Sequence, residues 1–337
     1  MRVNLTWAFR ALWVVLPVAA GPVLGAALDD RSGPLQLVAS VALWLGWAAV
    51  LVASLVPSTV SLTVLRTLAP AAAVTTTWAV AVAVGTDADV GEIGLSEAAG
   101  LVVSAAAAVV AMAPSVGDTF VDGSSYGPER RFALRVPAPV LLGPIEVTWA
   151  LLLAGALAGP LLLAAEQWVA GAAALVVGLP LGFWAVRSLH TLSRRWLVFV
   201  PGGVVIHDPL TVTESVLMPK ARIARLGPAP ADTDAYDLTQ RALGLALQVD
   251  LNDPLPVSLY RPRADRPETA TVERLLFTPT RPAHVLNAAE VHPRHVAPAA
   301  RRRRLASPGD APGPAMGRQT SMGRQAAVPP PSTRSPE

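Results

Sequence analysis

Six long apolar stretches occupy the first 190 residues of this 337-residue chain and constrain its fold more than any other feature. A helix needs about 20 mainly apolar residues to cross the roughly 30 Å hydrocarbon core of a bilayer. Each stretch is long enough for one crossing and too uniformly apolar for a core strand. The stretches cover about residues 11–28, 35–56, 60–84, 93–113, 144–165 and 168–189. The sequence therefore predicts an α-helical polytopic membrane bundle of six transmembrane helices over residues 1–190.

Composition supports a membrane protein and excludes several chemistries. Hydrophobic residues make up 52% of the chain and charged residues 15%, whereas about a quarter of an average soluble domain is charged. The chain contains no cysteine. Disulfides, thiolate catalysis and cysteine-ligated metal centres are therefore excluded.

The first stretch has a second interpretation as a cleavable signal peptide. Arg2 precedes it, and the small residues Gly25 and Ala26 lie near its end, as in a cleaved leader. Pro17 and Pro22 interrupt the apolar run, and five further spans follow. A retained span is therefore the favoured interpretation, and cleavage would not invert the remaining spans.

The distribution of arginine predicts the orientation of the spans. Basic residues near span ends are retained on the cytoplasmic side. One side of the six spans carries nearly all of these arginines, namely Arg2, Arg10, Arg130, Arg131, Arg135, Arg187, Arg194 and Arg195. The opposite loops are acidic and hold only Arg31. We therefore expect a multi-pass protein of the plasma (inner) membrane with both termini in the cytoplasm.

Three ionisable residues, Arg66, Glu97 and Glu146, fall inside the predicted spans. Ionisable residues deep in a bilayer often mark a transport path. Each of the three lies within about two turns of a predicted helix end, from which a long side chain can reach the interface. We therefore favour snorkelling, and transport stays an alternative.

Glycines spaced four apart predict where helices pack closely. Small residues at this spacing allow two helix backbones to approach each other. The last two spans contain two such pairs, Gly155 with Gly159 and Gly178 with Gly182. We expect these four residues to form a helix-packing face within the chain, and dimerisation through them is the alternative.

The connection between the fourth and fifth spans, residues 114–143, is unusually long. Asp118 and Asp122 could belong to a cation site, but further oxygen ligands do not follow at a known spacing. A turn and a solvated loop are therefore expected. Its basic segment is predicted to lie on the anionic inner leaflet, with Arg130, Arg131 and Arg135 as candidate lipid contacts.

After Arg195 the apolar pattern becomes short and alternating, which predicts strands. Trp196–Val200 and Val204–His207 flank a Pro-Gly-Gly turn and are expected to form a hairpin. Further strands are expected at about 214–219, 222–226, 243–251, 257–260 and 272–277, with a turn at 252–254. A helix should then begin at Pro282 and run to about residue 291. We therefore predict a small, mainly antiparallel cytoplasmic β domain over residues 191–291.

This region resembles the bacterial pleckstrin-homology-like (PH-like) domains of membrane proteins. The resemblance covers about Trp196 to Val291 and rests on an aromatic-led strand–turn–strand, the basic PKARIARLGPA strand and the final Arg-Pro helix. It implies a small barrel or sandwich capped by a helix and used for protein or membrane-surface contacts. An acidic insertion from Ala229 to Asp237 departs from the pattern. The whole chain also resembles conserved, uncharacterised multi-pass membrane proteins of high-GC bacteria.

The histidines do not form a recognisable catalytic or metal-binding pattern. No GxSxG elbow, phosphate loop, dinucleotide fingerprint or HExxH motif appears in the sequence. His207 and Asp208 are adjacent at a strand end, where alternation directs their side chains to opposite faces. We therefore expect no catalytic, metal or cofactor site, and an enzyme is the least favoured class.

From His292 onward the chain loses its periodicity and becomes rich in proline, which is typical of disorder. This tail holds eight basic and two acidic residues, so it accounts for the net positive charge of the protein. Its run of Arg301, Arg302, Arg303 and Arg304 is a candidate contact for anionic lipid headgroups. A merely solvated tail is the alternative, and nucleic-acid binding is disfavoured.

Together these features predict a non-enzymatic scaffold or regulatory protein that presents a PH-like module at the cytoplasmic membrane face. Its expected partners are the lipid bilayer, anionic lipid headgroups and another membrane or cytoplasmic protein. The alternative is a transporter or permease subunit with a cytoplasmic regulatory domain.

Overall fold

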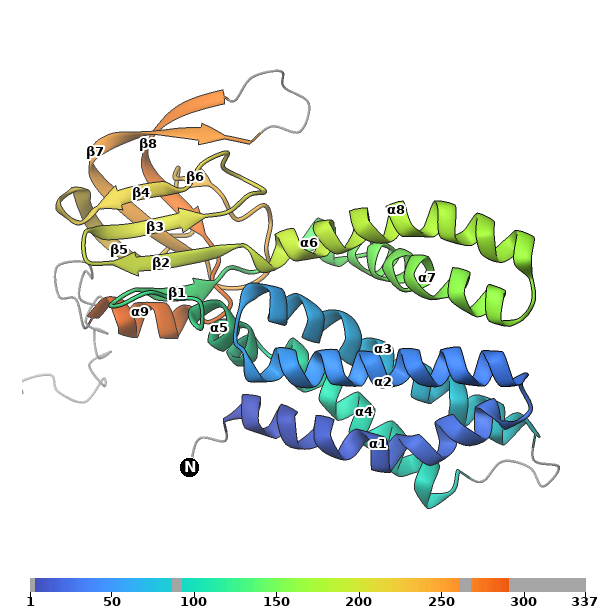
Figure 1. Ribbon diagram of the computed structural model, residues 1–337. Coiled ribbons are helices and arrows are strands. Elements are labelled where there is room, and N and C mark those ends of the chain that lie inside the picture. Colours follow the sequence, from blue (N-terminus) through green and yellow to red (C-terminus); the bar gives the residue numbers. More distant parts are fainter. Residues whose placement is uncertain (1–3, 87–92, 261–267, 291–337) are drawn as a thin grey trace, which may run out of the picture. The chain divides into compact units, whose positions relative to one another are not determined.

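The computed structural model of the protein describes residues 4–86, 93–260 and 268–290. Six of its helices are long and apolar enough to cross a membrane (Figure 1). They are α1 (Leu5–Asp29), α2 (Gly33–Leu55), α3 (Thr59–Thr86), α4 (Leu95–Met112), α7 (Pro144–Ala164) and α8 (Trp168–Ser193). The predicted set of six spans is confirmed, and the protein is a multi-pass membrane protein. The tail with its four consecutive arginines lies outside the described residues.

Tryptophan side chains connect the helices inside the bundle. Trp13 of α1 donates from Nε1 to the Trp47 carbonyl oxygen of α2 at 2.9 Å, and Trp47 donates in return to the Trp13 carbonyl oxygen at 2.8 Å. Trp149 of α7 donates to the Thr67 carbonyl oxygen of α3 at 2.9 Å. These bonds matter because a polar group in hydrocarbon finds no partner in the lipid. Cleavage of the first span would remove one half of the reciprocal pair.

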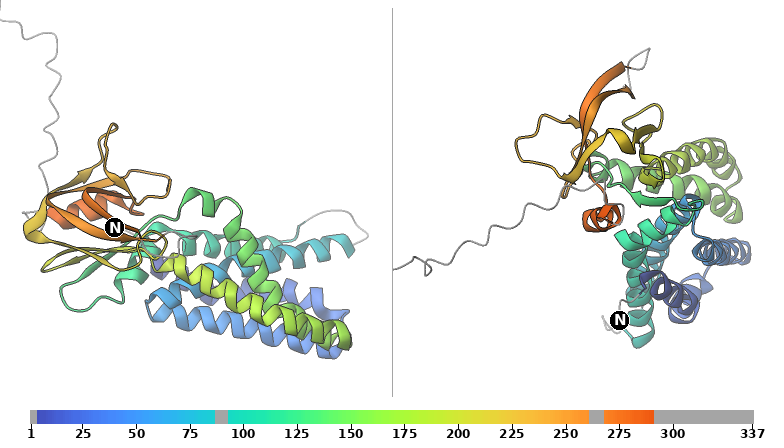
Figure 2. Two further views of the ribbon diagram at one scale, coloured as in Figure 1. Left: turned by 90° about the horizontal axis from the view of Figure 1, so that it is seen from above. Right: turned by 90° about the vertical axis from the view of Figure 1, so that its left-hand side faces the viewer.

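The helices α7 and α8 form an antiparallel hairpin whose close contact depends on glycine (Figures 1 and 2). A Cβ atom at Gly178 would lie 2.9 Å from the Gly155 carbonyl oxygen, and a Cβ atom at Gly159 would collide with the Leu175 side chain. At Gly182, which is also buried, the nearest atoms would be 3.9 Å away. Gly155, Gly159 and Gly178 therefore lie where the two backbones approach each other most closely.

The β domain contains two sheets within the described residues. The first has the antiparallel order β1 (Arg130–Ala133), β2 (Trp196–Val200), β3 (Gly203–His207) and β4 (Val216–Pro219). The second has the order β5 (Ile223–Pro228), β7 (Leu247–Leu259), β8 (Glu268–Phe277) and β6 (Tyr236–Asp237). A short 3-10 helix, η1 (Lys220–Arg222), joins the sheets. The final helix α9 (Pro282–Glu290) packs Val285 and Ala289 into the shared core, and its start agrees with the predicted helix.

The strand β1 corrects the predicted domain boundary. It belongs to the connection between the fourth and fifth spans, yet it pairs with β2 beyond α7 and α8, with Arg130 opposite Phe199 and Ala133 opposite Trp196. Phe132 lies in the core of the β domain, which explains why the segment joins the sheet. The β domain therefore starts before residue 191 and includes this strand. The basic segment forms the edge strand of the first sheet, and its contact with the leaflet stays a prediction.

Two short helices also lie in the connection that was expected to be a solvated loop. They are α5 (Pro114–Asp122) and α6 (Ala138–Leu141). The side chains of Val116, Phe120 and Val121 on α5 are buried in the core of the helical bundle. The connection is therefore largely folded, because these apolar residues recur at helical spacing and face the bundle.

The strand β7 corrects a second expectation. A turn was predicted at residues 252–254, but β7 runs through them, and its pairing with β8 shifts register between Asp250 and Leu255. An irregularity of this kind allows a strand to bend. It also accommodates Pro254, which cannot donate a ladder hydrogen bond. The predicted hairpin of β2 and β3 is confirmed.

Candidate functional site

A buried carboxylate connects the helices to the β domain. Asp118 lies on α5, and its side chain is only 6% exposed. Its Oδ1 accepts hydrogen bonds from the Ala133 backbone N–H at 3.2 Å and from the Thr280 hydroxyl at 3.0 Å. Its Oδ2 lies 3.6 Å from Arg281 Nη1 and 3.6 Å from His284 Nδ1. One side chain therefore joins α5 to β1 and to the beginning of α9.

Burial shifts the pKa of Asp118. Loss of hydration raises the pKa of the carboxyl group above its ordinary value. The hydrogen bonds from Thr280 and Ala133 and the charges of Arg281 and His284 act in the opposite direction. Asp118 is thus neither a solvated loop residue nor part of a cation site. It is a buried carboxyl group that faces positive side chains.

Arg66 of α3 adds a further positive charge beside this carboxylate. A Cβ atom at Gly117 would lie 2.6 Å from Arg66 Nη2, so the guanidinium group packs on the α5 backbone next to Asp118. Its Nε is buried and has no hydrogen-bond partner in the described part of the chain. The snorkelling expectation for Arg66 is therefore replaced by a contact inside the protein.

Glu97 and Glu146 lie where they were expected, in the first turns of α4 and α7. Glu146 accepts a hydrogen bond from the Gly143 backbone N–H at 2.9 Å, and Glu97 accepts one from the Ser96 hydroxyl at 2.9 Å. The positive end of a helix dipole stabilises acidic side chains at such positions. Both carboxylates therefore lie at the N-terminal ends of spans.

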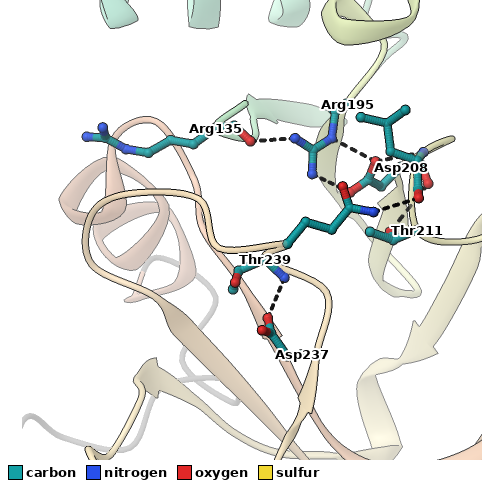
Figure 3. A network of polar contacts seen from close by, with 8 residues as sticks. Arg135, Arg195, Asp208, Thr211, Asp237 and Thr239 are labelled. Carbon is teal, nitrogen blue, oxygen red and sulfur yellow. Dashed lines mark hydrogen bonds and ion pairs between the residues drawn. The ribbon is translucent and has the colours of Figure 1, made fainter. Parts of the chain in front are cut away.

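A second buried ion pair joins the end of α8 to the β domain (Figure 3). Arg195 donates from Nε and from Nη2 to the two carboxylate oxygens of Asp208, each at 2.7 Å. The two side chains are 2% and 1% exposed. Arg195 Nη1 also donates to the Arg135 carbonyl oxygen at 2.5 Å. The pair therefore holds together the segment that leaves β1, the entry to β2 and the segment that follows β3.

The same network reaches a loop between β6 and β7. Asp208 Oδ1 accepts a hydrogen bond from the Leu210 backbone N–H at 3.1 Å. The Leu210 carbonyl oxygen accepts one from Gln240 Nε2 at 2.7 Å. Within the loop, the Thr239 backbone N–H donates to Asp237 Oδ1 at 2.6 Å (Figure 3). This loop is thereby fastened to the ion pair beside α8.

A stack of side chains lies next to the ion pair. The rings of Trp196 and His207 are stacked with their centroids 4.7 Å apart, and the Arg131 guanidinium lies 5.6 Å from the Trp196 ring centroid. Burial lowers the pKa of His207, and the charge of Arg194 lowers it further. His207 and Asp208 therefore belong to different clusters, as alternation along the strand predicted.

The candidate lipid contacts of the connection differ in exposure. Arg130 is 56% exposed and lies 3.3 Å from an oxygen of Asp122. Arg131 is 18% exposed and pairs with Glu129 at 3.3 Å. The Nε atom of Arg135 is buried. Lipid contact stays a prediction for all three, and Arg130 is the most accessible of them.

Comparisons with known proteins provide no relative for this chain. No protein-family model matches it, and neither a curated protein nor a solved structure does. Within residues 4–86, 93–260 and 268–290, no group of three or more His, Asp or Glu side chains could hold a metal ion.

Sequence reasoning missed the roles of Asp118 and Arg195. The partners of Asp118 at 280–284 are far away along the chain, so no local spacing joins them. For Arg195 the sequence does contain a signal. In the register of the predicted hairpin, Arg195 and Asp208 lie opposite each other, one position beyond the Trp196–His207 pair. Alternation along a strand directs the two side chains to the face opposite that of Trp196 and His207.

Removing one member of the buried pair should strongly destabilise the β domain. We expect Arg195→Met to lower the free energy of unfolding by about 3–5 kcal/mol, because Asp208 is then left buried without a partner. The double variant Arg195→Met/Asp208→Leu should recover much of the loss, since no unpaired charge remains. Denaturation of the detergent-solubilised protein, followed by tryptophan fluorescence, measures both effects.

The partly exposed pair of Arg225 and Asp250, with an N–O distance of 3.4 Å, provides the control. The variant Arg225→Met should change the free energy of unfolding by less than about 1 kcal/mol, because water screens this pair. Equal effects of Arg195→Met and Arg225→Met would contradict a structural role for the buried pair.

Proposed function

We propose that this protein is a non-enzymatic scaffold or regulatory membrane protein that presents a PH-like module at the cytoplasmic face of the plasma membrane. The observation that carries the proposal is the pairing of β1 with β2. The module is built from two chain segments that bracket the α7–α8 hairpin. It is therefore held against the membrane domain rather than tethered by one linker. A partner bound to it is presented in a fixed position.

The order of elements in the β domain supports a PH-like assignment. Two mainly antiparallel sheets are followed by a helix that contributes Val285 and Ala289 to their common core. The resemblance implies this arrangement of sheets and capping helix. The chain departs from a simple module because the α7–α8 hairpin is inserted between its first two strands.

The sheet also supports the proposed orientation. Paired strands must lie on one side of the membrane, so the α4–α7 connection and the segment after α8 share a side. Both carry arginines of the group that favours the cytoplasm, Arg130 and Arg131 in one and Arg194 and Arg195 in the other. The retention of basic residues therefore favours a cytoplasmic β domain.

The way in which charges are used supports a scaffold rather than a catalyst. The most deeply buried ionic groups of the β domain, Arg195 and Asp208, bind each other and the backbone. Asp118 likewise bonds to a backbone N–H and to Thr280. These groups serve to hold segments of the chain together.

Cysteine labelling tests the orientation without background, because the chain has no cysteine. Ser32 is exposed between α1 and α2, and Tyr126 is 80% exposed between α5 and β1. In intact cells, a membrane-impermeant maleimide should label Ser32→Cys and should label Tyr126→Cys only after permeabilisation. Labelling of Tyr126→Cys in intact cells, with Ser32→Cys protected, would refute the proposed orientation.

Site-specific photo-crosslinking tests the scaffold role. Leu217 is 49% exposed on β4, an edge strand of the first sheet. A photoreactive amino acid at Leu217 in the full-length protein should give an adduct of discrete mass in cells, since an edge strand offers unpaired backbone groups to a partner. The same amino acid at Ser32 is the control. No adduct at Leu217, or the same adduct at both positions, would argue against a partner on this module.

A further inference from the structure

The loop between β6 and β7 exposes two leucines in an unusual backbone conformation. Leu243 is 64% exposed and Leu245 is 52% exposed. Shortly before them, Gln240 and Arg241 have φ angles of 50° and 61°. Residues other than glycine rarely adopt such angles, and two in succession indicate a loop whose shape is imposed by its surroundings. The loop is thus held so that it displays apolar side chains.

Two contacts fasten this loop beside the transmembrane helices. On one side, Gln240 bonds to the Leu210 carbonyl oxygen in the network around Arg195, which follows the last residue of α8 by two positions. On the other side, Gly244 lies against Arg135, because a Cβ atom there would be 3.0 Å from Arg135 Nε. Arg135 precedes α6 by three residues, which span at most about 10 Å. Because the Arg135 carbonyl oxygen accepts a hydrogen bond from Arg195, both attachment points lie near the end of α8.

Exposed leucines also lie at the start of the α7–α8 hairpin. At the end of α6, Leu141 and Leu142 are 44% and 79% exposed, directly before α7 begins at Pro144. The exposed apolar side chains of the spans face lipid. Leu243 and Leu245 flank Gly244, which lies against Arg135, so the β domain also displays apolar side chains beside the segment that leads to α6.

Unpaired positive charges accompany the exposed leucines. Arg241 is exposed in the loop, and Arg187 and Arg194 are exposed at the end of α8. Within the described part of the chain, none of the three forms an ion pair. Apolar side chains flanked by arginine are the composition that binds the boundary between headgroups and acyl chains.

We propose that the Leu243–Leu245 loop inserts into the headgroup region of the bilayer in which the protein resides, with Arg241 next to lipid phosphates. The β domain then contacts the bilayer directly, in addition to its connections to α6 and α8. This inference rests on the spans lying in a bilayer and not on the scaffold role. Photo-crosslinking at Leu217 can fail while the test of loop insertion succeeds. Loop insertion can likewise fail while photo-crosslinking succeeds.

Quenching by spin-labelled lipid tests the insertion in the full-length protein. Leu243→Cys, labelled with a small fluorophore, is reconstituted into vesicles of phosphatidylcholine and phosphatidylglycerol that contain a nitroxide near the headgroup. The control is Gly202→Cys in the β2–β3 turn, where an added Cβ meets no atom within 4 Å. This turn lies at the far end of β2 from α8, about 17 Å along the strand.

The label at Leu243 should be quenched at least about twofold more than the label at Gly202, because only the former reaches the headgroup region. Leu245→Cys should give the same result and serves if the first variant does not fold. Equal quenching at the loop and at Gly202 would overturn the proposal. The proposal would also be overturned if the loop label is shielded from water at a high protein-to-lipid ratio and loses this shielding when the protein is diluted with lipid. In that case a second copy of the protein, and not the bilayer, would cover the loop.

Discussion

The pairing of β1 with β2 is the constraint on which the rest of the structure depends. After β1 the chain crosses the membrane as α7, returns as α8 and enters the same sheet beside the strand that it left. The pairing continues past the strand, where the Leu134 backbone N–H donates to the Arg195 carbonyl oxygen at 3.0 Å. The end of β1 and the end of α8 must therefore lie close together, and α7 has to return the chain beside α8. The glycine-lined contact between α7 and α8 meets this requirement.

Two buried acidic groups make this arrangement specific. Burying a charge is costly unless it is paired and hydrogen-bonded, so each acidic group accepts few alternative surroundings. Asp118 requires β1, Thr280 and the first turn of α9 to meet on α5. Asp208 requires Arg195, which in turn binds the Arg135 backbone. Both clusters contact the segment around β1, so they reinforce the sheet at the place where it joins the helices.

The sequence predicted the parts of the fold whose signals are local. Six spans follow from runs of about 20 apolar residues, and the β2–β3 hairpin follows from alternation around a Pro-Gly-Gly turn. The strand β1 could not be predicted, because four residues carry little periodicity and its partner lies beyond two spans. In β7, Asn252, Asp253 and Pro254 have the composition of a turn, but pairing with β8 on both sides keeps the segment in the strand. Asp118 lies in a short polar segment whose burial depends on distant residues.

The direct test of the shared sheet is a disulfide between its first two strands. Arg131 of β1 lies opposite Val198 of β2. In the same row of the sheet, Val205 of β3 and Leu217 of β4 follow, so Leu217 is three strands away from Arg131. A protease site inserted between α7 and α8 cuts the chain into two halves. We expect oxidised Arg131→Cys/Val198→Cys to keep the halves together on a non-reducing gel. The control Arg131→Cys/Leu217→Cys should release them, since about 14 Å of strand spacing is too far for a disulfide. Separation of the halves in the first variant would contradict the shared sheet, and so would equal retention in both.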